Sequence, residues 1–168
     1  GWLIDAVERR GELDRTVVVF ASDHGEMLGD HDCWYKKLPW EGSTRVPLIV
    51  AGPGIDARQT RDDLVELVDL AATLPELAGI TAPEHWDSRS LVPLLRGETG
   101  AELHRDVATS IMLGEWRMIT DGHWKLIDWL QQERELELYD LHADPSELIN
   151  RASQQPEIVG QLQNQLQR

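Results

Sequence analysis

Two short apolar runs most strongly limit the folds open to this chain. Residues 16–21 read TVVVFA and residues 46–51 read VPLIVA, and each run has the length of a strand. Unbroken runs of β-branched and aliphatic residues are typical of strands that are buried on both faces of a parallel sheet. An amphipathic helix precedes the first run, with Gly11 as its stop. The order of helix, strand and loop therefore predicts an α/β fold.

The pattern changes near residue 100, after a predicted helix over residues 69–78 and a linker over residues 81–100. Four short strands are predicted beyond it, over residues 107–113, 116–120, 123–128 and 135–139. Asp121-Gly122 predicts a hairpin turn in which both residues have positive φ, and a terminal helix is expected from about Pro156. We therefore expect an α/β part over residues 1–100 and a small antiparallel β subdomain with a terminal helix over residues 101–168.

Charge and cysteine content exclude several classes of function. The chain has 168 residues, with 16 basic against 30 acidic side chains and a net charge of -14, which disfavours binding to nucleic acid. No apolar run approaches the roughly 18 residues of a membrane span. Cys33 is the only cysteine, so no disulfide within the chain and no multi-cysteine zinc site can form. Because Gly1 is not an initiator Met and the chain opens inside a helix, we interpret it as part of a longer protein.

Most of the residues suited to catalysis lie between the two apolar runs. Asp23 and His24 directly follow the first run, and the carboxyl end of a strand is where open α/β sheets place their ligands. A carboxylate and an imidazole suit a divalent cation. The alternative is that Asp23 caps a helix with Glu26, as in a capping box, although Gly25 weakens such a helix. The spacing leaves ligation, capping and a solvated loop open.

Lysine is scarce, and two of the three lysines are neighbours in this segment. Lys36 and Lys37 follow the Asp-His pair, while Lys125 lies far along the chain. An ammonium group at this place is suited to a phosphoryl or sulfuryl oxygen, and the alternative is an exposed surface lysine. His31 is a second candidate, either as a ligand or as a proton donor to a leaving group, and its alternative is a hydrated loop residue.

Two further expectations concern the neighbours of these residues. Trp34 and Trp40 flank the lysines and either wall a pocket or pack against the protein. Glu41 and Arg45 are one helical turn apart and are expected to pair.

The order of these motifs resembles the sulfatase family of the alkaline phosphatase superfamily. The resemblance starts with SDHGEMLGDH at residues 22–31 and continues with WYK at 34–36 and RVPLIVAGPG at 45–54. It extends through residues 67–80 and Ser90-Leu91 to the C-terminal motifs: Lys125-Leu-Ile127, Glu137-Leu-Tyr-Asp-Leu141, Asp144-Pro-x-Glu147 and Asn150. The chain thus resembles the C-terminal half of an arylsulfatase-like hydrolase, which implies part of an alkaline-phosphatase-like α/β sandwich with a small antiparallel C-terminal sheet.

This resemblance implies roles for four residues. Asp23 and His24 would be metal ligands, and Lys36 and His31 would be catalytic. The metal would be a divalent cation, with Ca²⁺ as first choice and Mn²⁺ or Mg²⁺ as alternatives. The nucleophile, a formylglycine made from a Cys or Ser, would lie in the missing N-terminal half. Cys33 lacks the neighbouring Pro and Arg of that motif and is not expected to replace it.

Three functions follow as alternatives. In the first, the longer protein is a metal-dependent sulfatase that hydrolyses a small-molecule or glycan sulfate ester, and the isolated chain is inactive. In the second, the same scaffold acts on a phosphonate or phosphate ester, because His24 stands where many sulfatases carry Asn. In the third, motivated by the net charge of -14, the chain is a non-catalytic acidic domain that binds metal or a partner.

Overall fold

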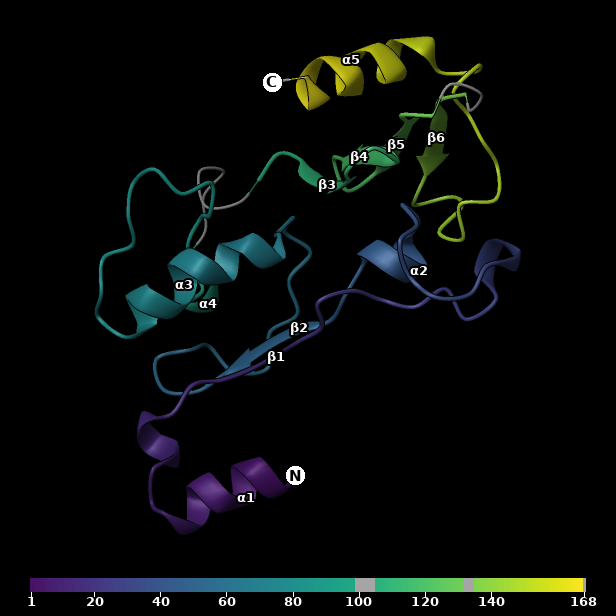
Figure 1. The fold of residues 1–168 in the computed structure, drawn as a ribbon. Helices are drawn as coiled ribbons and strands as arrows, with labels where there is room; N and C mark the ends of the chain where they lie inside the picture. The colour runs from purple at the N-terminus through teal and green to yellow at the C-terminus, as the bar shows by residue number, and fades with distance from the viewer. Residues whose placement is uncertain (99–104, 132–134, 168) are drawn as a thin grey trace. The chain divides into compact units, whose positions relative to one another are not determined.

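The chain divides into two compact units in the computed structural model, which describes residues 1–98, 105–131 and 135–167 (Figure 1). One unit comprises residues 1–22 and 47–104, and the other comprises residues 23–46 and 105–168. The segment 23–46, which carries the predicted site, thus belongs to the same unit as the C-terminal sheet. The predicted domain boundary at residue 100 stays a prediction. Within the described residues, no helix has both the length and the apolar character that crossing a bilayer requires.

The first unit contains a two-stranded antiparallel sheet. Helix α1 (Trp2–Arg9) and a 3-10 turn (Leu13–Arg15) precede β1 (Val18–Ala21), which pairs with β2 (Leu48–Ala51). The strands were expected in a parallel sheet, and for this pair that prediction is wrong. The apolar runs indicate strands, but they carry no information on the direction of the partner.

Two helices complete this unit. A 3-10 turn (Leu67–Asp69) leads into α3 (Leu70–Leu77), which continues through Pro75, and the expected linker contains the short helix α4 (Val92–Leu95). The buried carboxylate of Asp69 accepts hydrogen bonds from the backbone N–H groups of Glu66, at 2.9 Å, and of Arg89, at 2.8 Å. Asp69, a residue of the family motif at 67–80, therefore fastens the start of α3 to the segment before α4.

The second unit is built on a four-stranded antiparallel sheet in the order β3-β4-β5-β6. Its strands are β3 (Ala108–Met112), β4 (Trp116–Thr120), β5 (Trp124–Trp129) and β6 (Glu137–Asp140). The predicted small antiparallel sheet is confirmed, and so is the terminal helix α5 (Pro156–Leu166). The turn between β4 and β5 differs from the expected type, because only Gly122 has positive φ. Asp121 instead accepts the N–H groups of His123 and Trp124 with its carboxylate.

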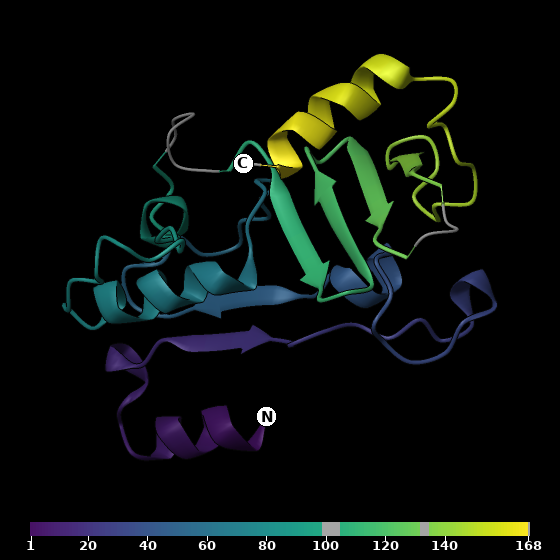
Figure 2. The ribbon, with the colours of Figure 1, turned by 45° about the horizontal axis from the view of Figure 1, so that its top comes forward.

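Each face of this sheet packs against a different part of the chain. Helix α5 covers one face, as Figure 2 shows, around a core of Ile119, Leu126, Leu138, Val159 and Leu162. The segment 23–46, which contains a 3-10 turn (Asp30–Asp32) and helix α2 (Glu41–Thr44), packs against the sheet through a second core. That core consists of Met27, Trp40, Trp116, Met118, Ile127 and Tyr139. The sheet therefore supports the segment that carries the candidate site.

Candidate active site

The structure brings three of the four predicted side chains together. The Nζ atom of Lys36 lies 2.6 Å from Nε2 of His24, although the two residues are 12 positions apart. The same Nε2 atom lies 3.6 Å from Oδ2 of Asp23. We define these three residues as the Asp-His-Lys group. It places a carboxylate, an imidazole and an ammonium around one point.

The contacts of His24 indicate which of its nitrogens is available to a ligand. Its Nδ1 atom lies 2.7 Å from the carbonyl oxygen of Gly25, which can only accept a hydrogen bond. Nδ1 therefore donates to that carbonyl, and Nε2 accepts a hydrogen bond from the Lys36 ammonium. This is the tautomer that a metal-binding histidine needs, with a backbone carbonyl to orient the ring.

The helix-cap alternative for Asp23 is wrong. The first helical turn after Asp23 in the described residues is Asp30–Asp32, which lies too far along the chain for a cap. The carboxylate of Asp23 instead accepts the N–H of its neighbour His24, at 3.1 Å, and its side chain is exposed.

The loop that carries Lys36 holds much of the unusual backbone in the described chain. Seven described residues other than glycine have positive φ, and five of them lie between residues 28 and 37: Leu28, His31, Asp32, Tyr35 and Lys37. A left-handed conformation costs about 1–3 kcal/mol for such a residue and clusters at functional sites, where surrounding contacts hold it. Tyr35 and Lys37 flank Lys36 directly.

Gly25 allows this loop to lie directly against the backbone of α2. Its N–H donates to the carbonyl of Ser43 at 2.8 Å. A Cβ atom at residue 25 would lie 2.1 Å from the carbonyl oxygen of Gly42, closer than any side chain tolerates. The glycine beside His24 is therefore required by close backbone packing.

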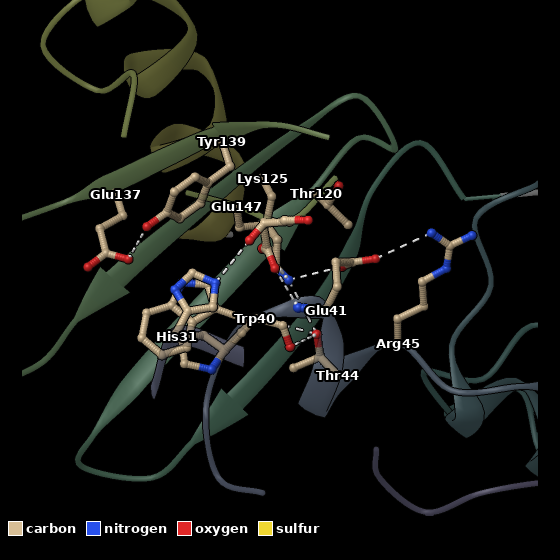
Figure 3. A network of polar contacts seen from close by, with 12 residues as sticks. His31, Trp40, Glu41, Thr44, Arg45, Thr120, Lys125, Glu137, Tyr139 and Glu147 are labelled. Atoms are coloured by element: carbon tan, nitrogen blue, oxygen red, sulfur yellow. Dashed lines mark hydrogen bonds and ion pairs between the residues drawn. The ribbon is translucent and has the colours of Figure 1, made fainter. Parts of the chain in front are cut away.

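His31 lies in a different environment from the Asp-His-Lys group. Its ring stacks on Trp40, as Figure 3 shows, and the two ring centroids are 4.1 Å apart. Its Nε2 atom lies 3.1 Å from the carbonyl oxygen of Ser146. These contacts fasten the 3-10 turn to the loop after β6. A catalytic role for His31 stays a prediction.

A buried ion cluster joins the segment 23–46 to the sheet (Figure 3). The side chain of Lys125 on β5 is fully buried, and its Nζ lies 2.9 Å from Oε1 of Glu41 and 2.9 Å from Oε1 of Glu147. Glu147 also accepts the backbone N–H of Glu41, at 2.6 Å. The predicted pair of Glu41 and Arg45 is present at 3.6 Å, on the exposed side of the cluster. Burial raises the pKa of the Glu147 carboxyl above its usual range, and the charge of Lys125 opposes this effect.

Sequence reasoning from the residues did not find this cluster. Lys125 has the same parity along β5 as the buried Ile127, so it points to the face that packs against segment 23–46. The sequence signal for the cluster is a lysine at a strand position that faces the core. Its two carboxylate partners lie far away in sequence.

The tryptophans of this unit mostly pack against protein. Trp116 is buried and donates its Nε1–H to the carbonyl of Lys37 at 2.9 Å, while Trp129 and Trp124 pack against the two cores of the sheet. Trp40 is buried in the first core, so of the two expected pocket residues only Trp34 is exposed. Cys33 also packs against the first core.

The described residues do not form a complete metal site by themselves. Across residues 1–98, 105–131 and 135–167, no three His, Cys, Asp or Glu side chains gather in an arrangement that would hold a metal ion. Asp23 and His24 alone therefore do not make up a metal site.

Comparison with known proteins finds relatives over nearly the whole chain. The family model described as "N-sulphoglucosamine sulphohydrolase, C-terminal" matches residues 29–168. Arylsulfatase K of Xenopus laevis is 36% identical over 99% of the chain, which corresponds to 33% of that protein.

Two solved structures have the same fold over 99% of the chain. One is BT4656 in complex with its substrate D-glucosamine-2-N,6-O-disulfate, with 30% identity and a TM-score of 0.90 over 36% of that chain. The other is a phosphonate monoester hydrolase from Silicibacter pomeroyi, with 25% identity and a TM-score of 0.89 over 37% of that chain. The chain spans about a third of the length of the relatives that it matches.

Proposed function

The chain belongs to the sulfatase family, and we propose that it supplies two metal ligands and a charge-neutralising lysine to a sulfuric ester hydrolase. The observation that carries the proposal is the Asp-His-Lys group, in which Lys36 Nζ lies 2.6 Å from His24 Nε2. A purely acidic interaction domain has no need for this arrangement beside a strained loop. The substrate would be a sulfate ester of a glycan or of a small molecule.

The donor atoms of Asp23 and His24 fit a divalent cation. The carboxylate Oδ2 and the imidazole Nε2 lie 3.6 Å apart, and a bound cation would take the Nε2 lone pair that faces the Lys36 ammonium in this structure. A hard oxygen with an imidazole nitrogen suits Ca²⁺, Mn²⁺ or Mg²⁺, with Ca²⁺ as our first choice. When bound, such a cation would polarise the ester and orient the nucleophile. The remaining ligands would come from the rest of the protein.

Lys36 would meet the negative charge of the substrate. Its ammonium is held beside His24, so it would lie next to an ester group that the metal orients. A compact cation there would neutralise the non-bridging oxygens as their charge grows in the transition state. Lys37 is not expected to share this role, because the resemblance of Trp34-Tyr35-Lys36 to the family motif singles out Lys36.

The nucleophile would lie outside this chain. We expect a formylglycine in the N-terminal part of the longer protein, and Cys33 is not a substitute because it packs against the core of the second unit. His31 remains our candidate for protonation of the leaving group, although its contacts with Trp40 and Ser146 support a fastening role.

The second candidate is a phosphonate or phosphate ester hydrolase. It is favoured by the likeness to the phosphonate monoester hydrolase, because a divalent cation and a lysine would serve either ester. Kinetics of the full-length protein with an aryl sulfate and with a phenyl phosphonate separate the two. A higher kcat/KM on the sulfate supports the sulfatase, and a higher value on the phosphonate assigns the second function. No turnover of either ester by the metal-loaded protein would contradict both.

A further inference from the structure

The backbone on both sides of Lys36 adopts a conformation that residues with a side chain rarely adopt. The φ angle is +72° at Tyr35 and +78° at Lys37. In this left-handed region the Cβ atom crowds the following carbonyl, so the conformation persists only where other contacts hold it. Lys36 therefore lies between two backbone positions that need a restraint from elsewhere in the protein.

Two buried donors supply that restraint, one on each side of Lys36. The backbone N–H of Met27 donates to the carbonyl of Tyr35 at 3.0 Å, and the indole Nε1–H of Trp116 donates to the carbonyl of Lys37 at 2.9 Å. Met27 and Trp116 are 1% and 3% exposed, so water competes little for these hydrogen bonds. The first donor belongs to the same loop, whereas the second belongs to β4 and lies 79 residues away.

We infer that Trp116 is a positioning residue for Lys36. Its indole N–H holds the carbonyl of Lys37 and so fixes the backbone from which the ammonium projects toward His24. The inference rests on the proposed function, because an effect on turnover requires that Lys36 meets the substrate. Through this hydrogen bond, the C-terminal sheet holds the Lys36 ammonium in its place.

A double-mutant cycle in the full-length protein tests the inference, with an aryl sulfate as the substrate. Trp116→Phe keeps an aromatic ring in the core but removes the donor. Because a displacement of about 1 Å can lower a rate up to about a hundredfold, we expect kcat and kcat/KM to fall together by about tenfold or more. In a protein that already carries Lys36→Ala, Trp116→Phe should cause no further loss. An equal loss in both backgrounds would mean general damage and would overturn the inference.

Trp129→Phe is the matched control. It removes an indole donor from the same sheet, but that donor binds Oε1 of Glu137, at 2.9 Å, and not the Lys36 loop. We expect its kcat to stay within about twofold of wild type. Loss of turnover equal to that of Trp116→Phe would overturn the inference. If Lys36→Ala alone leaves turnover unchanged, the proposed role of Lys36 fails and the inference falls with it. If only Trp116→Phe is silent, the inference alone fails.

Discussion

Asp23 is the residue at which metal ligation is most directly measurable. Its carboxylate lies 3.6 Å from His24 Nε2 and caps no helix, so its removal should cost metal and little stability. We expect Asp23→Ala to weaken metal binding by at least about tenfold in the full-length protein. Elemental analysis after dialysis measures this, with Asp14→Ala on the exposed 3-10 turn of the first unit as the control. Unchanged metal content in Asp23→Ala would refute ligation.

At the scale of single residues, the sequence predicts contacts between side chains that lie close along the chain. Asp23, His24 and Lys36 lie within one loop, and the structure brings their side chains together. The spacing alone left their roles open. Lys125 and Trp116 could not be predicted in this way, because each acts on a residue about 80 positions away. Only the pairing of the strands shows which side of the sheet faces the loop.

The close contact between the His24 loop and α2 predicts that a methyl group added at residue 25 destabilises the protein. In Gly25→Ala the new Cβ would clash with the backbone carbonyl of Gly42, and a backbone cannot move aside as a side chain can. We expect a loss of about 1–3 kcal/mol in unfolding free energy, together with reduced turnover. Thermal unfolding of the full-length protein measures this.

Gly160 provides the control for that substitution. It lies inside α5 with open space where a Cβ would be, so Gly160→Ala should stabilise the protein by about 0.5–1 kcal/mol. Equal stability of the two variants would contradict the close packing at Gly25.

The buried ion cluster predicts a dependence of stability on pH. Burial raises the pKa of Glu147 in the folded state, so its contribution to stability is complete below the pKa of the unfolded chain and is lost as pH rises through the folded pKa. The unfolding free energy of wild type minus that of Glu147→Gln should therefore fall as the pH rises above the pKa of an unfolded Glu, about 4.3. Denaturant titrations over this range measure the difference. A difference that grows with pH would mean that the ion pair with Lys125 outweighs the cost of burial.

Elements were predicted more reliably than their partners. The four C-terminal strands and α5 follow from alternation and turn residues, which are local signals. The direction of pairing between β1 and β2 does not, because an apolar run is compatible with either direction.

At the scale of the whole molecule, the chain exposes an apolar strand face. In the first unit, Phe20 and Ile49 face each other across the β1–β2 pair and are 59% and 60% exposed. An apolar strand face of this kind favours association. We expect the 168-residue chain on its own to self-associate, which size-exclusion chromatography with light scattering measures. A monodisperse monomer with a sharp cooperative melt would contradict this expectation.

The isolated chain should also lack turnover of an aryl sulfate, because we place the nucleophile and the remaining metal ligands elsewhere in the longer protein. An activity assay of the purified chain measures this. Turnover that is abolished by mutation of Cys33 would show that the nucleophile lies within these residues.

The measurement that tests the central claim most directly compares two neighbouring lysines. In the full-length protein, Lys36→Ala should lower kcat and kcat/KM by about a hundredfold, because a cation that stabilises growing charge is lost. Lys36→Arg should also be impaired, since a planar guanidinium does not replace a compact ammonium. Lys37→Ala should have little effect, because the substitution keeps the backbone carbonyl to which Trp116 donates. Steady-state kinetics on an aryl sulfate and a phenyl phosphonate decide the matter: equal and small effects at Lys36 and Lys37 would contradict the account, since neither lysine would then meet the substrate.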